Sequence, residues 1–386
     1  MSGPAILPSK TRAQVDAQMT QTSEPAESMI SVRGLSRRYG TFTALDALDL
    51  DVKRGEFVTL LGPSGSGKST LLNLISGMTE ASEGTIAIDG RDATHLPTNQ
   101  RGLGMVFQNY ALMPHMTVFE NIAFPLQVRK VPKPEIETRV REVLKLIQLE
   151  HVADRKPKQL SGGQQQRISL ARCIVYRPSI ILMDEPLGAL DKKLREDMQL
   201  EIKRLHAELG VTMIYVTHDQ EEALAMSDRI VLMRKGRVEQ QGAPEEMYFR
   251  PDTLFTADFL GSSNLFQGEL DAAAGLLVTP QGRLPLPLTR DGAPASGQAV
   301  LMLRPESLHL VAPSEATGGL TGTVADSTVL GSFVRHFINL PGGKRAIAQE
   351  PSSLANSRPA RGTEVGLSWK PETSRLLPTD PDFSSL

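Results

Sequence analysis

The segment GPSGSGKST at positions 62 to 70 constrains the fold more than any other part of the sequence. It contains the pattern G-x-x-x-x-G-K-[S/T], which needs a buried strand before it and a helix after it. Both neighbours fit, because GEFVTLL (55 to 61) is a short apolar run and STLLNLISG (69 to 77) has helical spacing that ends on glycine. The sequence therefore predicts a phosphate-binding loop in an α/β fold.

Each residue type in this loop has a physical role in holding phosphate. Glycines let backbone N–H groups turn inward around phosphate oxygens, and the helix N-terminus adds a partial positive charge. We expect Lys68 to place its ammonium on the β- and γ-phosphates and Ser69 to bind magnesium through its hydroxyl. A flexible glycine turn is the alternative interpretation, which the flanking strand and helix disfavour. The predicted nucleotide-binding residues are Gly62, Pro63, Ser64, Gly65, Ser66, Gly67, Lys68, Ser69 and Thr70.

An acidic pair supplies the second half of a nucleoside triphosphate site. The run SIILMDE (179 to 185) is apolar until it ends in Asp184 and Glu185. We expect Asp184 to hold magnesium and Glu185 to polarise the attacking water. Two acids also occur at ordinary strand ends, so this interpretation depends on the loop upstream in the same chain.

Three single residues are further candidates, each with a structural alternative. His218 ends the apolar run VTMIYVTHD, at the edge of the sheet where a γ-phosphate should lie. Gln108 follows another short run, and Tyr39 precedes a glycine turn. The histidine could instead be structural, the glutamine could simply meet water, and the tyrosine could pack rather than stack on adenine.

A second glycine-rich segment, LSGGQQQR at 160 to 167, opens a helix predicted from about Gln164 to Val175. A helix start exposes free N–H groups and a partial positive charge, which suits an anion. Ser-Gly-Gly alone would fit an ordinary serine N-cap equally well. The segment raises the question whether two glycine-rich loops serve one nucleotide or two.

Together, these motifs and their order resemble the ATP-binding subunits of ABC transporters. LSGGQQQR matches the family signature, positions 62 to 70 match Walker A, 180 to 185 match Walker B, and LGALD (187 to 191) matches the D-loop. The resemblance runs from about 30 to 262.

The resemblance also implies roles for the single residues. It implies that Tyr39 stacks on adenine, that Gln108 is the Q-loop residue that contributes to catalysis and metal binding, and that His218 is catalytic.

The family plan implies an answer to the question of two loops. ABC ATPases pair head to tail, so that the P-loop of one protomer and the signature of the other hold the same ATP. The implied contacts of the signature are Ser161, Gly162, Gly163 and Gln164. The implied partners are a second copy of the chain through the ATPase domains, transmembrane permease subunits and, indirectly, a solute-binding protein. The chain would then work peripherally at the cytoplasmic face of the inner membrane, with ATP and Mg²⁺.

The pattern along the chain divides it into parts. We expect a disordered tail at 1 to 28 and an ABC ATPase domain at 29 to 262, which is an α/β P-loop NTPase fold with a helical subdomain at about 108 to 178. From 263 to 386, short alternating runs separated by Gly- and Pro-rich turns predict a small all-β barrel of the OB or TOBE type. By resemblance this barrel has a regulatory role.

Composition limits the class of protein. The 42 basic and 44 acidic residues give a net charge of -2, so we expect no nucleic-acid partner. Cys173 is the only cysteine, which excludes an intrachain disulfide and suits a reducing compartment. No apolar run approaches the ~18 to 20 residues that span a bilayer.

The transported solute is the least determined feature. The appended barrel and the run VFQNYALMPHMTVFENIAFPL resemble polyamine importers most closely. Importers for sugars, sulfate or ferric iron remain alternatives, because they share most of these residues. A soluble ABC ATPase of DNA repair or of the ribosome is a further alternative, although the chain has one cassette, no coiled-coil insert and no zinc cysteines.

Overall fold

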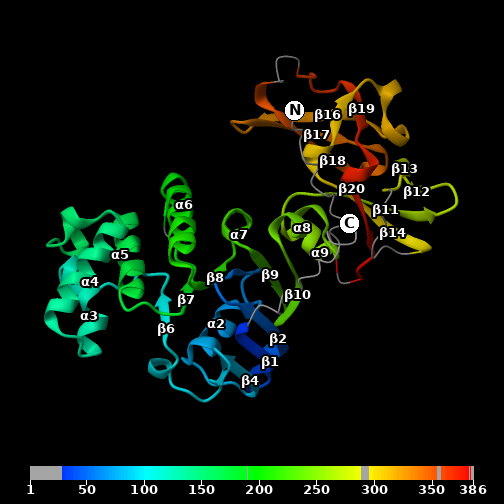
Figure 1. Cartoon of the computed structure of the whole chain (residues 1–386). Coiled ribbons are helices and arrows are strands. Elements are labelled where there is room, and N and C mark those ends of the chain that lie inside the picture. Colours follow the sequence, from blue (N-terminus) through cyan, green and yellow to red (C-terminus); the bar gives the residue numbers. More distant parts are fainter. Residues whose placement is uncertain (1–27, 189, 288–294, 354–357, 382, 384–386) are drawn as a thin grey trace, which may run out of the picture.

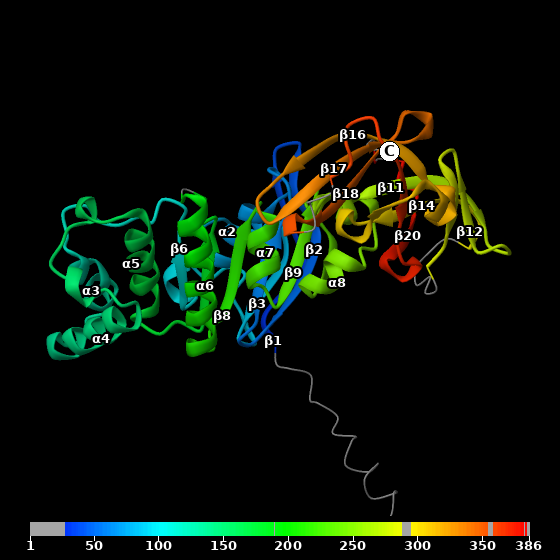
Figure 2. The same cartoon turned by 90° about the horizontal axis from the view of Figure 1, so that it is seen from above.

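The computed structural model describes residues 28–188, 190–287, 295–353, 358–381 and 383 (Figures 1 and 2). The predicted disordered tail lies outside these residues, except for Ser28, with which the first strand begins. Within the described part of the chain, no helix is long and apolar enough to cross a membrane.

The central sheet carries the predicted parallel strands. β3 (Phe57–Leu61) and β8 (Thr212–Thr217) are buried along their whole length, as expected for strands that are covered on both faces. All neighbouring strands run parallel except β10 (Arg237–Gly242) and β9 (Arg229–Arg234), because the edge strand β10 is antiparallel to β9. The α/β prediction is confirmed. In order across the sheet, the strands are β10 (Arg237–Gly242), β9 (Arg229–Arg234), β3 (Phe57–Leu61), β8 (Thr212–Thr217), β7 (Ile180–Asp184) and β6 (Leu103–Val106).

The structure has a second sheet, which is antiparallel and which the sequence patterns did not predict as a separate sheet. It packs with helix α2 (Lys68–Ser76) against one face of the central sheet, and a single apolar core contains Val32, Leu72 and Leu60 from the three layers. α2 ends at Gly77, which has a φ of 78°, as the sequence predicts. The strands are, in order, β2 (Phe42–Lys53), β1 (Ser28–Tyr39), β4 (Glu83–Ile88) and β5 (Arg91–Asp92).

A group of helices extends from one end of the central sheet (Figure 1). The helix after the signature begins two residues before Gln164, and the apolar face of the helix near Ile136 is buried. The first helix of the group was not predicted from the sequence, although Thr117 and Glu120 form a capping box at its start. Pro125 lies inside that helix and obscures the helical spacing of its apolar residues. The group consists of α3 (Val118–Val128), α4 (Lys133–Leu146) and α5 (Gly162–Ile174), which we call the helical subdomain.

Two helices connect the strands that carry the candidate site. α6 (Lys192–Leu209) lies between the helical subdomain and the sheet in both views, and Gly210 ends it with a φ of 60° (Figures 1 and 2). α7 (Gln220–Met226) follows β8 directly. Two short helices, α8 (Pro244–Phe249) and α9 (Leu254–Phe259), then lead toward the C-terminal part of the chain.

The C-terminal part is all-β, as predicted. Its strands form two five-stranded antiparallel sheets around one apolar core, which contains Phe266 and Trp369. The first sheet has the order β13 (Gly282–Pro285), β12 (Leu276–Thr279), β11 (Asn264–Asp271), β14 (Gly297–Leu303) and β20 (Ser374–Pro378). The second has the order β15 (His309–Val311), β19 (Glu364–Ser368), β16 (Thr321–Val329), β17 (Phe333–Asn339) and β18 (Arg345–Pro351).

A buried arginine anchors this part to the two short helices that precede it. Arg304 is 2% exposed, and burial lowers the pKa of its guanidinium. The guanidinium donates to the backbone carbonyls of Tyr248, Ala257 and Gly261 and lies 4.1 Å from the centroid of the Tyr248 ring. A buried cation is tolerated only when its donors are satisfied, so these contacts fix the junction between these helices and the C-terminal part.

Candidate nucleotide site

The loop between β3 and α2 has a backbone that only glycine can adopt at several points. Gly62, Gly65 and Gly67 have φ values of 151°, 78° and 103°. A Cβ added to Gly62 would lie 2.3 Å from the Met233 carbonyl oxygen, and one added to Gly67 would lie 2.7 Å from the Ala44 oxygen. Bare backbone is therefore required here, and it leaves N–H groups free of Cβ atoms for close approach to an oxyanion.

Lys68 begins α2 and folds back over this loop. Its side-chain ammonium donates to the carbonyl oxygens of Gly62 (2.8 Å) and Pro63 (3.0 Å), and the residue is only 5% exposed. Burial lowers the pKa of Lys68, while the nearby carboxylates of Glu185 and Asp184 favour its charged form. A buried cation above a glycine-rich loop at a helix N-terminus has the chemistry that a polyphosphate needs.

Ser69 and Asp184 meet at the edge of the central sheet. The Ser69 hydroxyl donates to Oδ1 of Asp184, at 3.1 Å. Burial raises the pKa of Asp184, whereas the hydrogen bond from Ser69 lowers it. A hydroxyl and a carboxylate side by side are hard oxygen donors of the kind that Mg²⁺ prefers. The donor set therefore fits the predicted metal.

The ends of β7 and β8 bring Glu185 and His218 together. Nδ1 of His218 lies 3.2 Å from Oε1 of Glu185. Glu185 has a φ of 44°, which is uncommon for a residue other than glycine, and its N–H donates to the carbonyl of Val216 at 3.0 Å. This backbone turn gives the carboxylate its direction toward the histidine. The side chains are 25% and 60% exposed respectively, so both can meet solvent and substrate.

Gln108 and Tyr39 lie nearer the margins of this arrangement. Gln108 is exposed in the turn after β6, and its side-chain Nε2 would lie 3.7 Å from a Cβ on Gly188. It therefore faces the loop that follows Glu185. Tyr39 ends β1 and is 49% exposed, and the guanidinium of Arg37 lies 4.5 Å from its ring centroid. A contact of the ring with adenine remains a prediction.

The signature segment lies at the N-terminus of α5. Ser161 caps this helix by accepting from the N–H of Gln164 at 3.4 Å, and the Gln164 amide oxygen accepts from the Ser161 N–H at 3.1 Å. A Cβ on Gly163 would lie 2.7 Å from Cδ1 of Leu194, so this helix start packs against α6. α5 belongs to the helical subdomain and is separated from α2 in both views (Figures 1 and 2). The fold does not bring the two glycine-rich loops together within one chain.

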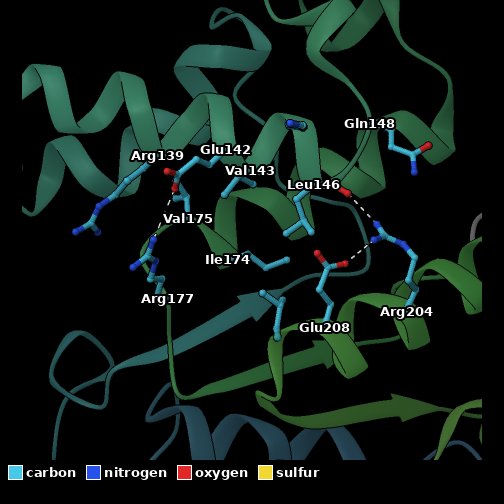
Figure 3. A pocket seen from close by; sticks show the side chains of 12 residues that line it. Arg139, Glu142, Val143, Leu146, Gln148, Ile174, Val175, Arg177, Arg204 and Glu208 are labelled. Carbon is cyan, nitrogen blue, oxygen red and sulfur yellow. Dashed lines mark hydrogen bonds and ion pairs between the residues drawn. The ribbon is translucent and has the colours of Figure 1, made fainter.

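A separate cavity of about 540 Å³ lies between the helical subdomain and α6 (Figure 3). It contains none of the predicted site residues. Two of its arginines are engaged with the protein itself: Arg177 pairs with Glu142 at 3.6 Å, and Arg204 donates to the Leu146 carbonyl at 2.8 Å. The cavity is thus separate from the predicted nucleotide site.

The sequence analysis missed a charged group beside His218. Glu222 is 3% exposed and accepts from the hydroxyls of Tyr215 (2.8 Å) and Thr217 (2.7 Å). Arg195 of α6 reaches Asp219 at 3.1 Å. The run DQEE after an apolar strand signals a helix start, and Asp219 does cap α7. Nothing in that local pattern indicates a partner on another helix.

Comparison with known proteins finds two matching family models and many similar proteins. The family model described as ABC transporter matches residues 45–188, and the model described as TOBE domain matches residues 301–377. The chain is 45% identical to the spermidine/putrescine import ATP-binding protein PotA of Marinobacter nauticus, over 92% of this chain and 97% of that one. It is 43% identical to the protein of the same name from Thermobifida fusca, over 97% and 100% of the two chains.

Solved structures match a little more than half of the chain. A bacterial ABC transporter cassette, solved as a dimer, is 39% identical with a TM-score of 0.51, and the match covers 56% of this chain and 99% of that one. The same cassette in a post-hydrolysis state bound to ADP and Pi is 37% identical, with a TM-score of 0.50 and the same coverage. The chain therefore belongs to the ABC transporter family, among its ATP-binding subunits that hydrolyse ATP.

Proposed function

We propose that the chain is the ATP-hydrolysing subunit of an ABC importer for polyamines of the spermidine and putrescine type. One observation supports the ATPase chemistry most: the Ser69–Asp184 and Glu185–His218 pairs lie at the ends of neighbouring strands beside the P-loop. The solute is inferred from relatives that are named for spermidine and putrescine import and that match nearly the whole chain.

In this proposal, the P-loop edge holds the phosphates. The backbone N–H groups of 62–67 and the ammonium of Lys68 bind the β- and γ-phosphate oxygens, and Tyr39 stacks on the adenine. Ser69 and Asp184 are the residues that would hold Mg²⁺, with Gln108 as a further ligand. Mg²⁺ would supply neutralisation of the charge that develops on the phosphates.

Hydrolysis is assigned to Glu185 and His218. A water oxygen attacks the γ-phosphorus, the bond to the β–γ bridging oxygen breaks, and ADP and phosphate leave. The Glu185 carboxylate orients the water and accepts its proton. His218 contacts this carboxylate at 3.2 Å, so it can hold the carboxylate in place and reach the γ-phosphate. The turn at Glu185 keeps the carboxylate at the strand end.

The signature segment points to a head-to-tail homodimer. Ser161, Gly162, Gly163 and Gln164 would bind the ATP held by the partner's P-loop, because their own P-loop lies in another part of the chain. The dimeric state of a similar cassette supports this arrangement. The dimer would bind transmembrane permease subunits at the cytoplasmic face of the inner membrane, and through them act with a solute-binding protein. The C-terminal sheets would have a regulatory role.

The chemistry is tested by Glu185→Gln, which keeps the shape of the side chain and loses the basic carboxylate. We expect ATP binding to persist and kcat to fall by ~10² to 10⁴, the range for loss of a general base. Glu196→Gln is the matched control, because Glu196 is 61% exposed on α6 and pairs only loosely with Lys192, at 4.0 Å. A Glu185→Gln enzyme with wild-type kcat would remove Glu185 from its assigned role.

The solute is tested in cells from which this gene is deleted. Uptake of labelled spermidine should fall, and re-expression of the wild-type chain should restore it, whereas Glu185→Gln should not. Labelled sulfate, ferric iron and a sugar are measured in parallel. If uptake of one of these falls and spermidine uptake does not, the polyamine assignment is wrong while the ATPase assignment stands.

A further inference from the structure

Arg195, in the first turn of α6, contacts both loops that carry the proposed hydrolytic residues. We propose that Arg195 is a positioning residue that holds His218 in its working geometry beside Glu185. This inference rests on the proposed roles of those two residues and assigns a role to a side chain that none of the sequence motifs includes.

Arg195 contacts two loops, one after β7 and one after β8. Nη2 donates to the backbone carbonyl of Leu190 at 3.1 Å, and Leu190 lies in the loop that connects Glu185 to α6. Nη1 lies 3.1 Å from Oδ2 of Asp219, the residue directly after His218. One planar guanidinium therefore joins the loop after β7 to the loop after β8, and its fork geometry fixes both distances at once.

A buried carboxylate lies beside this connection and forms an ion pair with it, without a hydrogen bond. Nε of Arg195 lies 3.8 Å from Oε1 of Glu222, while Oε2 of Glu222 accepts from the hydroxyls of Tyr215 and Thr217. Thr217 Oγ1 also accepts from the N–H of Asp219 at 3.0 Å. The loop after β8 is thus fixed to its own strand, and Arg195 adds the connection to α6.

Charge explains why arginine is needed at this position. Burial raises the pKa of Glu222, and the nearby charge of Asp219 acts in the same direction. Arg195 is a cation that contacts both carboxylates. The side chain of Asp219 is 26% exposed and that of Glu222 is 4% exposed. Without Arg195, the two carboxylates repel each other, and the loop that places His218 loses its lateral support.

The P-loop contacts do not depend on this group. Lys68 bonds to its own loop, and Ser69 bonds to Asp184, so neither contact passes through Arg195. Loss of Arg195 should therefore slow hydrolysis and leave ATP binding almost unchanged. A general loss of structure would weaken both.

The experiment compares Arg195→Met, Arg195→Lys and a matched control, Arg204→Met, in the full-length chain. Arg204 is on the same helix, pairs with two carboxylates and donates to a backbone carbonyl, but lies at the cavity of Figure 3. We expect kcat of Arg195→Met to fall by ~10- to 100-fold, the cost of a small misplacement of catalytic groups. Arg195→Lys should recover part of this loss, and Arg204→Met should stay within about twofold of wild type.

Three measurements distinguish a positioning role of Arg195 from a purely structural role. Thermal unfolding and the Kd for ATP should be similar in Arg195→Lys and wild type, and the Kd should be similar in Arg195→Met. The decisive readout is the same substitution in a His218→Ala background. If Arg195 acts through His218, Arg195→Met should cost much less there than in the wild type, because the effects of coupled residues do not add.

The outcomes are distinct. An equal loss of kcat in both backgrounds, or an equal loss in Arg204→Met, overturns the positioning role and leaves the proposed function intact. A His218→Ala enzyme with wild-type kcat overturns the proposed role of His218 and the positioning role together. Weaker ATP binding in proportion to kcat also overturns the inference, because it would show that the nucleotide site itself had been damaged.

Discussion

Considered residue by residue, the nucleotide site contains ionisable groups whose charged forms are disfavoured by burial. Burial lowers the pKa of Lys68 and raises the pKa of Asp184, so each group is harder to ionise in the folded protein than in the unfolded chain. The hydrogen bond between Ser69 and Asp184 offsets only part of this cost. Sites that bind charged ligands commonly give up stability in this way.

Asp184→Asn should therefore raise the thermal unfolding temperature at pH 7 to 8 by a few degrees, measured without nucleotide or magnesium. The folded pKa of Asp184 is raised, so its unfavourable ionisation is fully present above that folded pKa and is absent below the unfolded pKa. The advantage of the asparagine should accordingly shrink as the pH falls toward 4. The asparagine side-chain oxygen can still accept from Ser69, so the local hydrogen bond is kept.

Asp51→Asn is the control of opposite sign. Burial tends to raise the pKa of Asp51, but hydrogen bonds from Arg33, Ser31 and Ser28 and the charge of Arg33 bring it below its ordinary value. Its stabilising effect is present above the unfolded pKa and is lost as the pH falls through the folded pKa. Asp51→Asn should thus lower the unfolding temperature at pH 7. An Asp184→Asn protein that is less stable than wild type at neutral pH would contradict the account of Asp184.

At the scale of elements, the loop between β3 and α2 depends on close backbone contact. Gly62→Ala should reduce stability by more than ~1 kcal/mol and abolish ATP binding, because its Cβ would lie 2.3 Å from the backbone oxygen of Met233, which cannot move aside. Gly65→Ala is the matched comparison, because it is also at positive φ, yet no atom lies within 4 Å of its Cβ. The unfolding temperature tests this, and an equal fall in the two variants would refute the contact argument.

The sequence predicted those elements whose signals are local. The run 55 to 61 and the helix after it are recognisable, because burial on both faces and a terminal glycine leave direct marks in the sequence. The separate antiparallel sheet that contains β4 was not predicted, since strand partners are not encoded in a strand's own pattern. α3 was missed because Pro125 and a dense apolar run obscure its period.

At the candidate site, too, only residues with a local sequence signal could be predicted. Lys68, Asp184 and Glu185 were found because they lie inside motifs or at the end of an apolar run. Arg195 and Glu222 were not found, because they belong to different helices and only the fold makes them neighbours. Sequence patterns thus located the groups that face the substrate, whereas the side chains that support those groups could be identified only from tertiary contacts.

At the scale of the whole molecule, the two glycine-rich loops lie in different parts of one chain. The P-loop belongs to the central sheet, and the signature begins α5 in the helical subdomain (Figures 1 and 2). Each loop presents a helix N-terminus, which attracts an anion. A second copy of the chain would let both act on one ATP, and this can be tested without a structure of the dimer.

The test uses two substitutions that damage opposite halves of the proposed shared site. Lys68→Ala removes the cation of the P-loop, and Ser161→Arg blocks the signature. Either homodimer should be inactive, because each of its two sites carries one damaged half. In a heterodimer of the two variants, sharing across chains places both defects in one site and leaves the other intact. If each chain instead binds ATP with both of its own loops, both sites stay damaged.

Sharing across chains therefore predicts one competent site per heterodimer, and binding within one chain predicts none. Occlusion of ATP is the measurement, because turnover could require both sites at once. The purified heterodimer carries a different tag on each chain, the control is wild type with the same tags, and magnesium is saturating because Ser69 and Asp184 are expected to need it. About half of the wild-type occlusion is expected, since one of two sites remains intact. A heterodimer that occludes no more ATP than either parent would rule out the shared site.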